Sequence, residues 1–278
     1  MHDKLVEVLR WYQDMGVDVA VDDFAHDRFS ESRAGPVEIP QAAVPNEPHA
    51  SRRAASPPEV ATYSASAIED TASEAAASAR TLEELREKLA AFEGCGLKAT
   101  ATRLVFGDGN PHAKIMFIGE APGADEDRQG VPFVGRAGQL LDKMLASIGL
   151  DRSKVYIANV VPWRPPGNRT PTPLETAACL PFTRRQIAFV NPKILVCLGA
   201  AAAQTLLGAR EGIMRLRGRW FPFHLDDREI RVLAMFHPAY LLRQPAQKKL
   251  AWADLRLLAK EIDRLEIFEK SPSEISRS

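Results

Sequence analysis

Three polar motifs interrupt apolar segments of this chain, and each carries side chains capable of acid–base or hydrogen-bonding chemistry. They are GEAPGADED at residues 119–127, NVVPWRPPGNRTP at residues 159–171 and HPAYLLR at residues 237–243. Each motif lies at the end of a short apolar run with the composition of a buried strand. Ligands of open α/β sheets bind where the carboxyl ends of strands meet their loops. The spacing therefore predicts a ligand site built from these strand ends.

The first motif combines a tight turn with a run of carboxylates. Gly119, Pro122 and Gly123 allow a turn whose backbone amides can approach a ligand closely. The acidic run at residues 125–127 has two interpretations. It is either the first turn of a helix, where the helix dipole favours acidic residues, or a source of carboxylates for catalysis.

Two residues could recognise a planar ligand. Phe133 stands between Gly130 and Gly135, so it is either a core residue or a stacking wall for a flat molecule. Asn159 lies inside an apolar strand, where an amide must satisfy both its donor and its acceptor or carry an energetic cost. Its oxygen and NH2 group could serve the edge of a nucleobase that offers a matching donor and acceptor.

Both later motifs contain basic residues. Arg164 and Arg169 lie in a stiff proline-rich loop, which either faces phosphates or is an ordinary surface loop. His237 ends the last strand and precedes two leucines and Arg243. A lone histidine is more often structural than catalytic, but apolar side chains beside a cation can unstack a base and hold the nucleic-acid backbone. Arg217 and Arg219 are expected on the same DNA-facing side.

The elements that must position these residues alternate between strand and helix. Apolar runs predict strands at residues 114–119, 155–162, 194–199 and 230–236, and amphipathic stretches predict helices at 138–148, 173–190, 200–207 and 246–266. This alternation predicts an α/β fold, a three-layer αβα sandwich around a central four-stranded, mainly parallel sheet.

The N-terminal part has a different composition. Residues 1–29 predict a short helical appendage, and the Ala-, Ser- and Pro-rich residues 30–80 predict a disordered linker. Thr81 and Glu84 form a capping-box pattern, so a catalytic domain is expected at residues 81–268, followed by a disordered tail at 269–278.

The net charge of zero conceals an asymmetry. Residues 1–93 hold 9 Lys and Arg against 18 Asp and Glu, and residues 94–278 hold 27 against 18. The basic body could therefore meet a polyanion. No apolar run is long enough to span a membrane, and because the N-terminus is charged, a secretory signal is not expected. Three cysteines cannot form a complete disulfide framework, so a reduced cytoplasmic setting is expected.

The motifs resemble the uracil-DNA glycosylase superfamily, specifically its family 4, the iron–sulfur type. The resemblance covers residues 92–262 and rests on GEAPGADEDRQGVPFVGRAGQLLDKML, NVVPWRPPGNRTPTPLE and MFHPAYLLR. It implies that Glu120, with Ala121 and Gly123, forms a water-activating loop at the floor of a uracil pocket. Glu126 and Asp127 would lie close to the chemistry, and Glu120 and Glu126 are the expected catalytic carboxylates.

The resemblance also implies roles for residues of the other motifs. Phe133 would stack on uracil, Asn159 would read its O4 and N3 edge, and Asn168 would help to position water or the leaving base. His237 would stabilise the negative charge that develops on O2. The expected DNA-binding residues are Arg164, Arg169, Leu241, Leu242 and Arg243. The last three of these would form an intercalating loop.

The family's [4Fe–4S] cluster is held by four cysteines, whereas this chain has only Cys95, Cys179 and Cys197. Phe92 occupies the place of the first family cysteine. Either a cluster with three thiolates and an unusual fourth ligand forms, or the cluster is lost and its place is packed with apolar groups. The three cysteines are thus candidate ligands for a structural cluster, and the bond cleavage itself needs no cofactor.

The expected function is base excision repair by a monofunctional glycosylase. It would flip uracil out of single- or double-stranded DNA and hydrolyse its N-glycosidic bond, leaving an abasic site. The key motif positions hold no Lys, so lyase activity is not expected, and a basic insertion associated with covalent trapping is absent. The alternatives are a non-catalytic uracil-DNA or phage-replication-type binding module and, more weakly, a nucleotide-binding enzyme. A monomer is expected, and residues 1–29 are either a helix that docks a protein partner on a flexible tether or an appendage without a partner.

Overall fold

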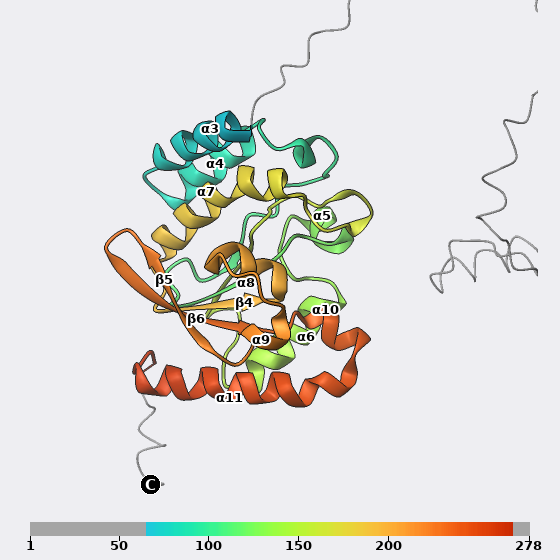
Figure 1. Cartoon of the computed structure of the whole chain (residues 1–278), viewed down its shortest axis with the longest axis vertical. Helices are drawn as coiled ribbons and strands as arrows, with labels where there is room; N and C mark the ends of the chain where they lie inside the picture. Colours follow the sequence, from blue (N-terminus) through green and yellow to red (C-terminus); the bar gives the residue numbers. More distant parts are fainter. Residues whose placement is uncertain (1–64, 269–278) are drawn as a thin grey trace, which may run out of the picture. The chain divides into compact units, whose positions relative to one another are not determined.

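The computed structural model describes residues 65–268 (Figure 1), and their centre is a six-stranded mixed sheet. The strands are β1 Asp108–Gly109, β2 Ile115–Gly119, β3 Tyr156–Asn159, β4 Ile194–Leu198, β5 Trp220–Leu225 and β6 Arg228–Met235. Their order is β1-β3-β2-β4-β6-β5. The four inner strands pair in parallel, and β1 and β5 pair antiparallel at the two edges. Parallel pairing brings the carboxyl ends of β2, β3, β4 and β6 to one end of the sheet.

Helices cover both faces of the sheet. The α-helices are α3 Ala65–Ala77, α4 Leu82–Ala91, α5 Ala124–Gln129, α6 Arg136–Ala146, α7 Pro173–Val190, α8 Ala200–Leu207, α9 Ile213–Leu216, α10 Pro238–Arg243 and α11 Lys248–Arg264, and the 3-10 helices are η1 Gly96–Ala99, η2 Pro166–Asn168 and η3 Pro245–Gln247. Figure 1 shows α3, α4 and α7 on one side of the sheet and α6 and α11 on the other.

Each face of the sheet has its own hydrophobic core. Met116 and Ile118 of β2 pack with residues of α4, α7 and α8, whereas Ile115 and Phe117 pack with residues of α6 and α11. The alternation follows from the strand geometry, in which successive side chains point to opposite faces. The described part of the chain is therefore a three-layer α/β arrangement.

The sheet is wider than the sequence predicts, with six strands in place of four. The two additional strands lie at the edges, where sequence signals are weak. β1 contains only two residues. β5 contains Pro222 and has one mostly exposed side, and proline is confined to edge strands because it cannot donate to the ladder.

The predicted disordered linker is wrong for its last part, because Ala65–Ala77 forms helix α3. Ala72 and Ala76 are buried against α7, and the Arg185 guanidinium of α7 donates to the carbonyl of Ala79 at 2.7 Å. Alanine is the strongest helix former, and its small side chain permits close packing. The scarcity of bulky residues predicted a linker. In this segment, however, the same small side chains allow the helix to pack closely against α7. Only half of the predicted capping box forms: the Thr81 hydroxyl accepts from the amide of Glu84 at 3.1 Å, whereas the Glu84 carboxylate accepts from the amide of Arg80 at 2.9 Å.

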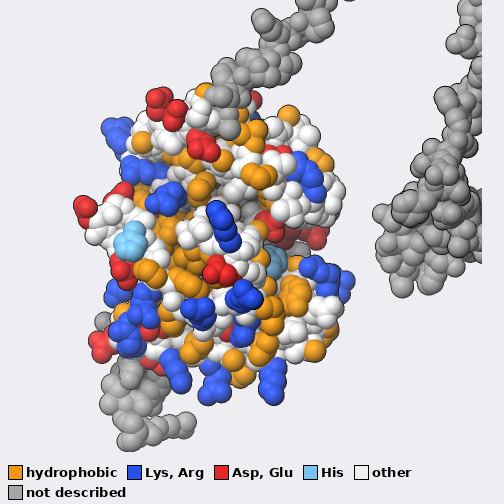
Figure 2. All heavy atoms as spheres, in the orientation of Figure 1, with side chains coloured by type: hydrophobic (Ala, Val, Ile, Leu, Met, Phe, Trp, Pro, Cys, Tyr) orange, Lys and Arg blue, Asp and Glu red, His pale blue; other side chains and the backbone are white. Residues whose placement is uncertain are grey.

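The predicted appendage at residues 1–29, most of the predicted linker and the tail at 269–278 lie outside the described residues. Within residues 65–268, no helix is both long and apolar enough to cross a bilayer. Figure 2 shows the molecule in the orientation of Figure 1, and Lys and Arg side chains gather along the lower edge of this view, where Figure 1 places α11. The exposed basic residues of that helix include Lys248, Lys249, Arg256 and Lys260.

Candidate active site

The three motifs meet at a cavity of about 730 Å³ at the carboxyl ends of the parallel strands. The loop after β2, the end of β3, the start of α8 and the start of α10 all contribute to it. Ten of the predicted site residues line the cavity: Glu120, Ala121, Gly123, Glu126, Phe133, Asn159, Asn168, Arg169, His237 and Arg243. Most of the candidates chosen from the sequence are therefore neighbours in space.

Asn159 ends β3 and presents an unpaired amide oxygen. Its side chain is 4% exposed, and its Oδ1 has no hydrogen-bond partner among residues 65–268. Gly119 is its register partner in β2, and a Cβ at Gly119 would lie only 2.5 Å from that Oδ1 and 2.6 Å from Cζ of Phe133. A buried unpaired amide is costly unless a ligand satisfies it. The site is therefore suited to a ligand with a complementary polar edge.

Phe133 and His237 lie beside this amide. Their ring centroids are 5.5 Å apart and the rings are inclined by 31°. Phe133 is 5% exposed and has the left-handed backbone angle φ +56°. A bulky residue in that conformation needs support from its surroundings. The ring therefore has a defined position next to the cavity.

His237 is held in one tautomer. It is the N-cap of α10, and its Nδ1 accepts from the amide of Ala239 at 3.1 Å. Burial, with a smaller contribution from the positive charge of Arg243, lowers the pKa of His237 to about 4. The imidazole is thus neutral at pH 7, and because Nδ1 accepts a hydrogen bond, the proton resides on Nε2. Nε2–H is then a donor for an oxygen in the cavity.

Glu120 provides a carboxylate that lines the cavity. Burial raises its pKa above the ordinary glutamate value, and a hydrogen bond from the Thr170 side chain partly offsets this shift. A partly desolvated carboxylate with a raised pKa is a better proton acceptor than an exposed one. Glu120 therefore has the features of a general base.

Glu126 was predicted to be a second catalytic carboxylate, but its oxygens already have backbone partners. Oε2 accepts from the amide of Gly123 at 3.1 Å, and Oε1 accepts from the amides of Val134 and Gly135 at 2.9 Å each. Glu126 therefore ties the loop after β2 to the loop that carries Phe133. Its neighbour Asp127 is engaged in the same way by the backbone and hydroxyl of Thr102. The acidic run at 125–127 begins helix α5, as one of its two interpretations proposed.

The basic loop after β3 makes internal contacts. The Arg164 guanidinium donates to Oδ1 of Asn168 at 2.8 Å, which occupies the oxygen of that predicted water-positioning residue. Arg169 forms two hydrogen bonds with the carboxylate of Glu175, at 2.8 and 2.6 Å, and this pair lowers the pKa of Glu175 to about 2. Arg169 therefore already has a carboxylate partner in this structure, and its contact with phosphate stays a prediction.

The predicted intercalating loop is helix α10, and its leucines are not equivalent. Leu241 is 1% exposed and belongs to the core on the α11 side, so the prediction that it forms a wedge is wrong. Leu242 is half-buried, and Arg243 is exposed and lines the cavity. Arg217, expected on the same side, is mostly buried and donates to Asp254 at 2.9 Å and to the carbonyl of Leu250 at 2.8 Å.

The cysteines do not fit a four-thiolate cluster. Cys95, Cys179 and Cys197 are all buried in one hydrophobic core, and the sulfurs of Cys95 and Cys179 are 3.8 Å apart, in contact with each other. The ring of Phe92 packs on that of Phe182, with centroids 5.1 Å apart. Residues 65–268 contain no group of three or more His, Cys, Asp and Glu side chains arranged to hold a metal. The three thiols therefore supply three of the four ligands that such a cluster ordinarily takes, and the apolar Phe92 cannot supply the fourth.

The sequence analysis did not select some residues that line the cavity. Gln204 of α8 and Tyr240 of α10 line it, as does Gly199 at the end of β4. Gly199 has φ +95°, and a Cβ there would lie 3.1 Å from Cβ of His237. A glycine directly after a buried strand was the available signal for Gly199.

Comparison with known proteins shows which proteins this chain is similar to. The family described as Uracil DNA glycosylase superfamily matches residues 106–256. The type-4 uracil-DNA glycosylase of Archaeoglobus fulgidus is 43% identical over 169 residues, which are 59% of this chain and 85% of that protein. The type-4 enzyme of Thermotoga maritima is 40% identical over 68% of this chain and 95% of its own length. A type-5 uracil-DNA glycosylase of Thermus thermophilus is 34% identical over 45% of this chain and 62% of that protein.

Proposed function

The chain belongs to the uracil-DNA glycosylase superfamily, and from this we infer that it is a DNA repair enzyme that excises uracil. The observation that carries the proposal is the buried, unpaired amide oxygen of Asn159 in one cavity with Phe133 and His237. A binding module would not need a carboxylate and a neutral histidine at the same cavity. The alternative of a non-catalytic module is therefore disfavoured.

Asn159 supplies base recognition in this proposal. Uracil offers a donor at N3 and an acceptor at O4, which match the Oδ1 acceptor and the NH2 donor of the amide. Cytosine presents the opposite pair and leaves both groups unsatisfied, which is costly in a buried site. Phe133 covers the face of the base, which has left the DNA stack as glycosylases require.

His237 and Glu120 divide the chemistry between them. Breaking the C1′–N1 bond leaves the electron pair on uracil and positive charge on the sugar. The Nε2–H of His237 donates to O2, where negative charge develops, and a preformed neutral donor needs no proton transfer. Glu120 holds a water molecule, whose oxygen bonds to C1′ and whose proton passes to the carboxylate. The products are free uracil and an abasic site.

Few of the residues predicted to bind DNA remain available for that contact. Arg243 is exposed at the cavity, and Leu242 is the partly exposed leucine of α10. Arg164 is half-buried and holds Asn168. We propose that Leu242 and Arg243 support the extrahelical base and that Arg164 mainly positions the loop.

An excision assay tests the function directly. The full chain is incubated with single- and double-stranded oligonucleotides that contain one uracil, and the products are treated with alkali. Strand scission only after alkali is expected, because a monofunctional glycosylase leaves an intact abasic strand. Intact strands after alkali would refute the glycosylase, and scission without alkali would refute its monofunctional character.

The variant Asn159→Asp is expected to excise uracil about 10²-fold more slowly, because it replaces the donor to O4 with a second, negatively charged acceptor. The ratio of the uracil rate to the cytosine rate should also fall. Single-turnover rates on matched oligonucleotides measure both quantities, and binding of abasic DNA serves as the control for folding. An unchanged preference for uracil would remove Asn159 from base recognition.

For the cluster site, we propose that apolar packing around Phe92 replaces iron–sulfur coordination. Burial raises the pKa of the Cys197 thiol to about 12, so this residue packs as a neutral apolar group. Protein purified without oxygen is expected to lack stoichiometric iron and acid-labile sulfide. Cys197→Ala should cost only about 1 kcal/mol of stability and leave excision intact. Stoichiometric iron that is lost in Cys197→Ala would contradict this proposal.

A further inference from the structure

The loop that carries Phe133 is held from both sides, and one of the holding residues lies outside every sequence motif. Resting on the proposed function, we propose that Arg152 is a positioning residue for base recognition. Its guanidinium fixes the backbone carbonyl of Phe133 and thereby sets the position of the ring that covers uracil.

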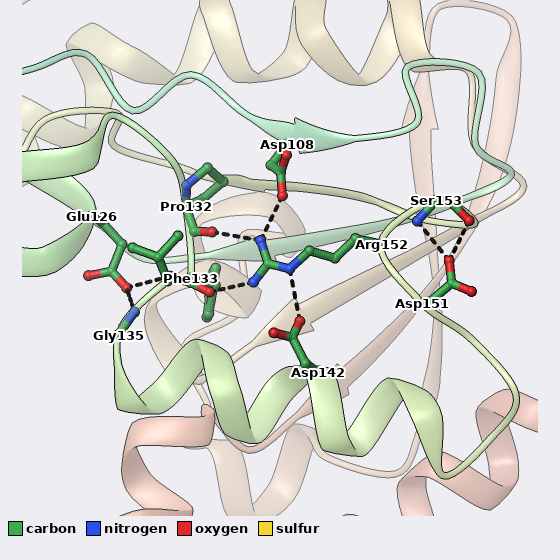
Figure 3. Close-up of polar contacts among 10 residues, drawn as sticks. Asp108, Glu126, Pro132, Phe133, Gly135, Asp142, Asp151, Arg152 and Ser153 are labelled. Carbon is green, nitrogen blue, oxygen red and sulfur yellow. Dashed lines mark hydrogen bonds and ion pairs between the residues drawn. The ribbon is translucent and has the colours of Figure 1, made fainter.

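Arg152 lies in the turn between α6 and β3 and connects three elements (Figure 3). It donates to Asp108 of β1 at 2.7 Å and to Asp142 of α6 at 2.9 Å. The same guanidinium donates to the carbonyl of Pro132 at 3.2 Å and to the carbonyl of Phe133. The two carboxylates thus orient a donor group whose remaining bonds go to the loop.

The opposite side of the loop is held by Glu126. Figure 3 shows its carboxylate turned toward Gly135, whose amide donates to it as does that of Val134. The carbonyls at 132 and 133 therefore contact a cation, and the amides at 134 and 135 contact an anion. Neither Arg152 nor Glu126 needs to touch the substrate to determine where Phe133 lies.

This support matters because of the conformation it maintains. Phe133 has φ +56°, an angle that L side chains rarely adopt without stabilising contacts. The carbonyl of Phe133 also lies against α6, where a Cβ at Gly138 would be 1.7 Å from its oxygen. Loss of the guanidinium would release this carbonyl and allow the residue to relax toward negative φ. The ring would then move relative to Asn159 and His237.

An arginine is required at this position. Four acceptors surround the group, and a planar guanidinium has five donors in a rigid fork. An ammonium has three donors at one point and cannot reach all four acceptors in this geometry. The conservative variant Arg152→Lys should therefore behave like a loss of the residue.

The test separates base binding from general stability. Arg152→Met is compared with Arg185→Met, which removes another partly buried arginine that donates to a backbone carbonyl, that of Ala79, and covers an aromatic ring, that of Phe189. The measurements are inhibition by free uracil, kcat and KM on a uracil oligonucleotide, affinity for uracil-free DNA, and the unfolding temperature. Asp142→Ala serves as a milder variant, because Asp142 lies on a helix surface and is one partner of Arg152.

Arg152→Met is expected to weaken inhibition by free uracil about tenfold and to raise KM, with unchanged affinity for uracil-free DNA. Asp142→Ala should show a smaller change in the same direction, which keeps the test open if Arg152→Met does not fold. Arg185→Met should lower the unfolding temperature and leave uracil inhibition unchanged. Equal uracil inhibition in wild type, Arg152→Met and Asp142→Ala would overturn the inference, as would an equal loss in Arg185→Met. A wild-type protein that excises no uracil would overturn the proposed function instead.

Discussion

The variant His237→Asn is expected to excise uracil about 10²–10³-fold more slowly than wild type, because it removes a preformed donor to the developing charge on O2. Asparagine is a good N-cap, so its Oδ1 can still accept the Ala239 amide that Nδ1 accepts now. The variant therefore tests the donor with little effect on α10. Single-turnover excision rates measure the effect, and thermal unfolding serves as the control. A rate within tenfold of wild type would assign His237 a structural role.

The low pKa of His237 gives this prediction a second signature. Its value of about 4 lies below the ordinary value of 6.5, so the ring gains its proton only as the pH falls toward 4. Its neutral form, with the proton on Nε2, therefore predominates at neutral pH. The pH–rate profile of the wild-type enzyme should show no step near pH 6.5, where an unperturbed histidine would titrate.

The variant Glu120→Gln is expected to lower the single-turnover rate by about 10²–10⁴-fold, because an amide cannot accept the proton of the attacking water. Burial raises the pKa of Glu120 above the ordinary 4.5, so the active carboxylate is lost as the pH falls through this raised value. The wild-type rate should therefore decline on the acid side before an ordinary glutamate would titrate. Glu120→Gln should lack that decline, and binding of uracil DNA is the control. A variant with the wild-type rate and the same acid decline would exclude Glu120 as the base.

Strand position made the centre of the site predictable from the sequence. Asn159 and His237 attract attention because each is a polar residue at the end of an apolar run, and parallel strands bring such ends together. Phe133 could be identified as a candidate from its flanking glycines. These predictions depend on local sequence and on the geometry of a parallel sheet.

Residues whose roles depend on distant partners could not be assigned from the sequence. Glu126 resembles Glu120 in type and position, and only the folded loop shows that its oxygens accept from Val134 and Gly135. Leu241 and Leu242 are adjacent, and the rotation of α10 places the first in the core. Arg152 lies outside every sequence motif. Its partners come from three separate elements, so only the folded chain brings them together.

In the fold too, elements with a strong local sequence signal could be predicted, and elements that depend on distant contacts could not. The four inner strands have apolar runs and were located to within a few residues, whereas β1 and β5 are short or contain proline. Helix α3 was not predicted, because linkers and closely packed helices share an alanine-rich composition. The contact with α7 decides between them, and that contact is not encoded locally.

The pairing of Arg169 with Glu175 and of Arg217 with Asp254 has a consequence for how binding responds to ionic strength. Each phosphate that a free cation neutralises releases condensed counterions, and the logarithm of affinity falls with the logarithm of salt concentration by about 0.9 per contact. Arginines that already have a carboxylate partner release few counterions when DNA arrives. Because Arg164 holds Asn168, Arg243 is the remaining arginine of the three motifs, and these motifs are expected to contribute a slope of only about −1. Recognition of uracil should thus persist at salt concentrations that dissociate proteins relying on many phosphate contacts, and affinity measured across a salt series would show it.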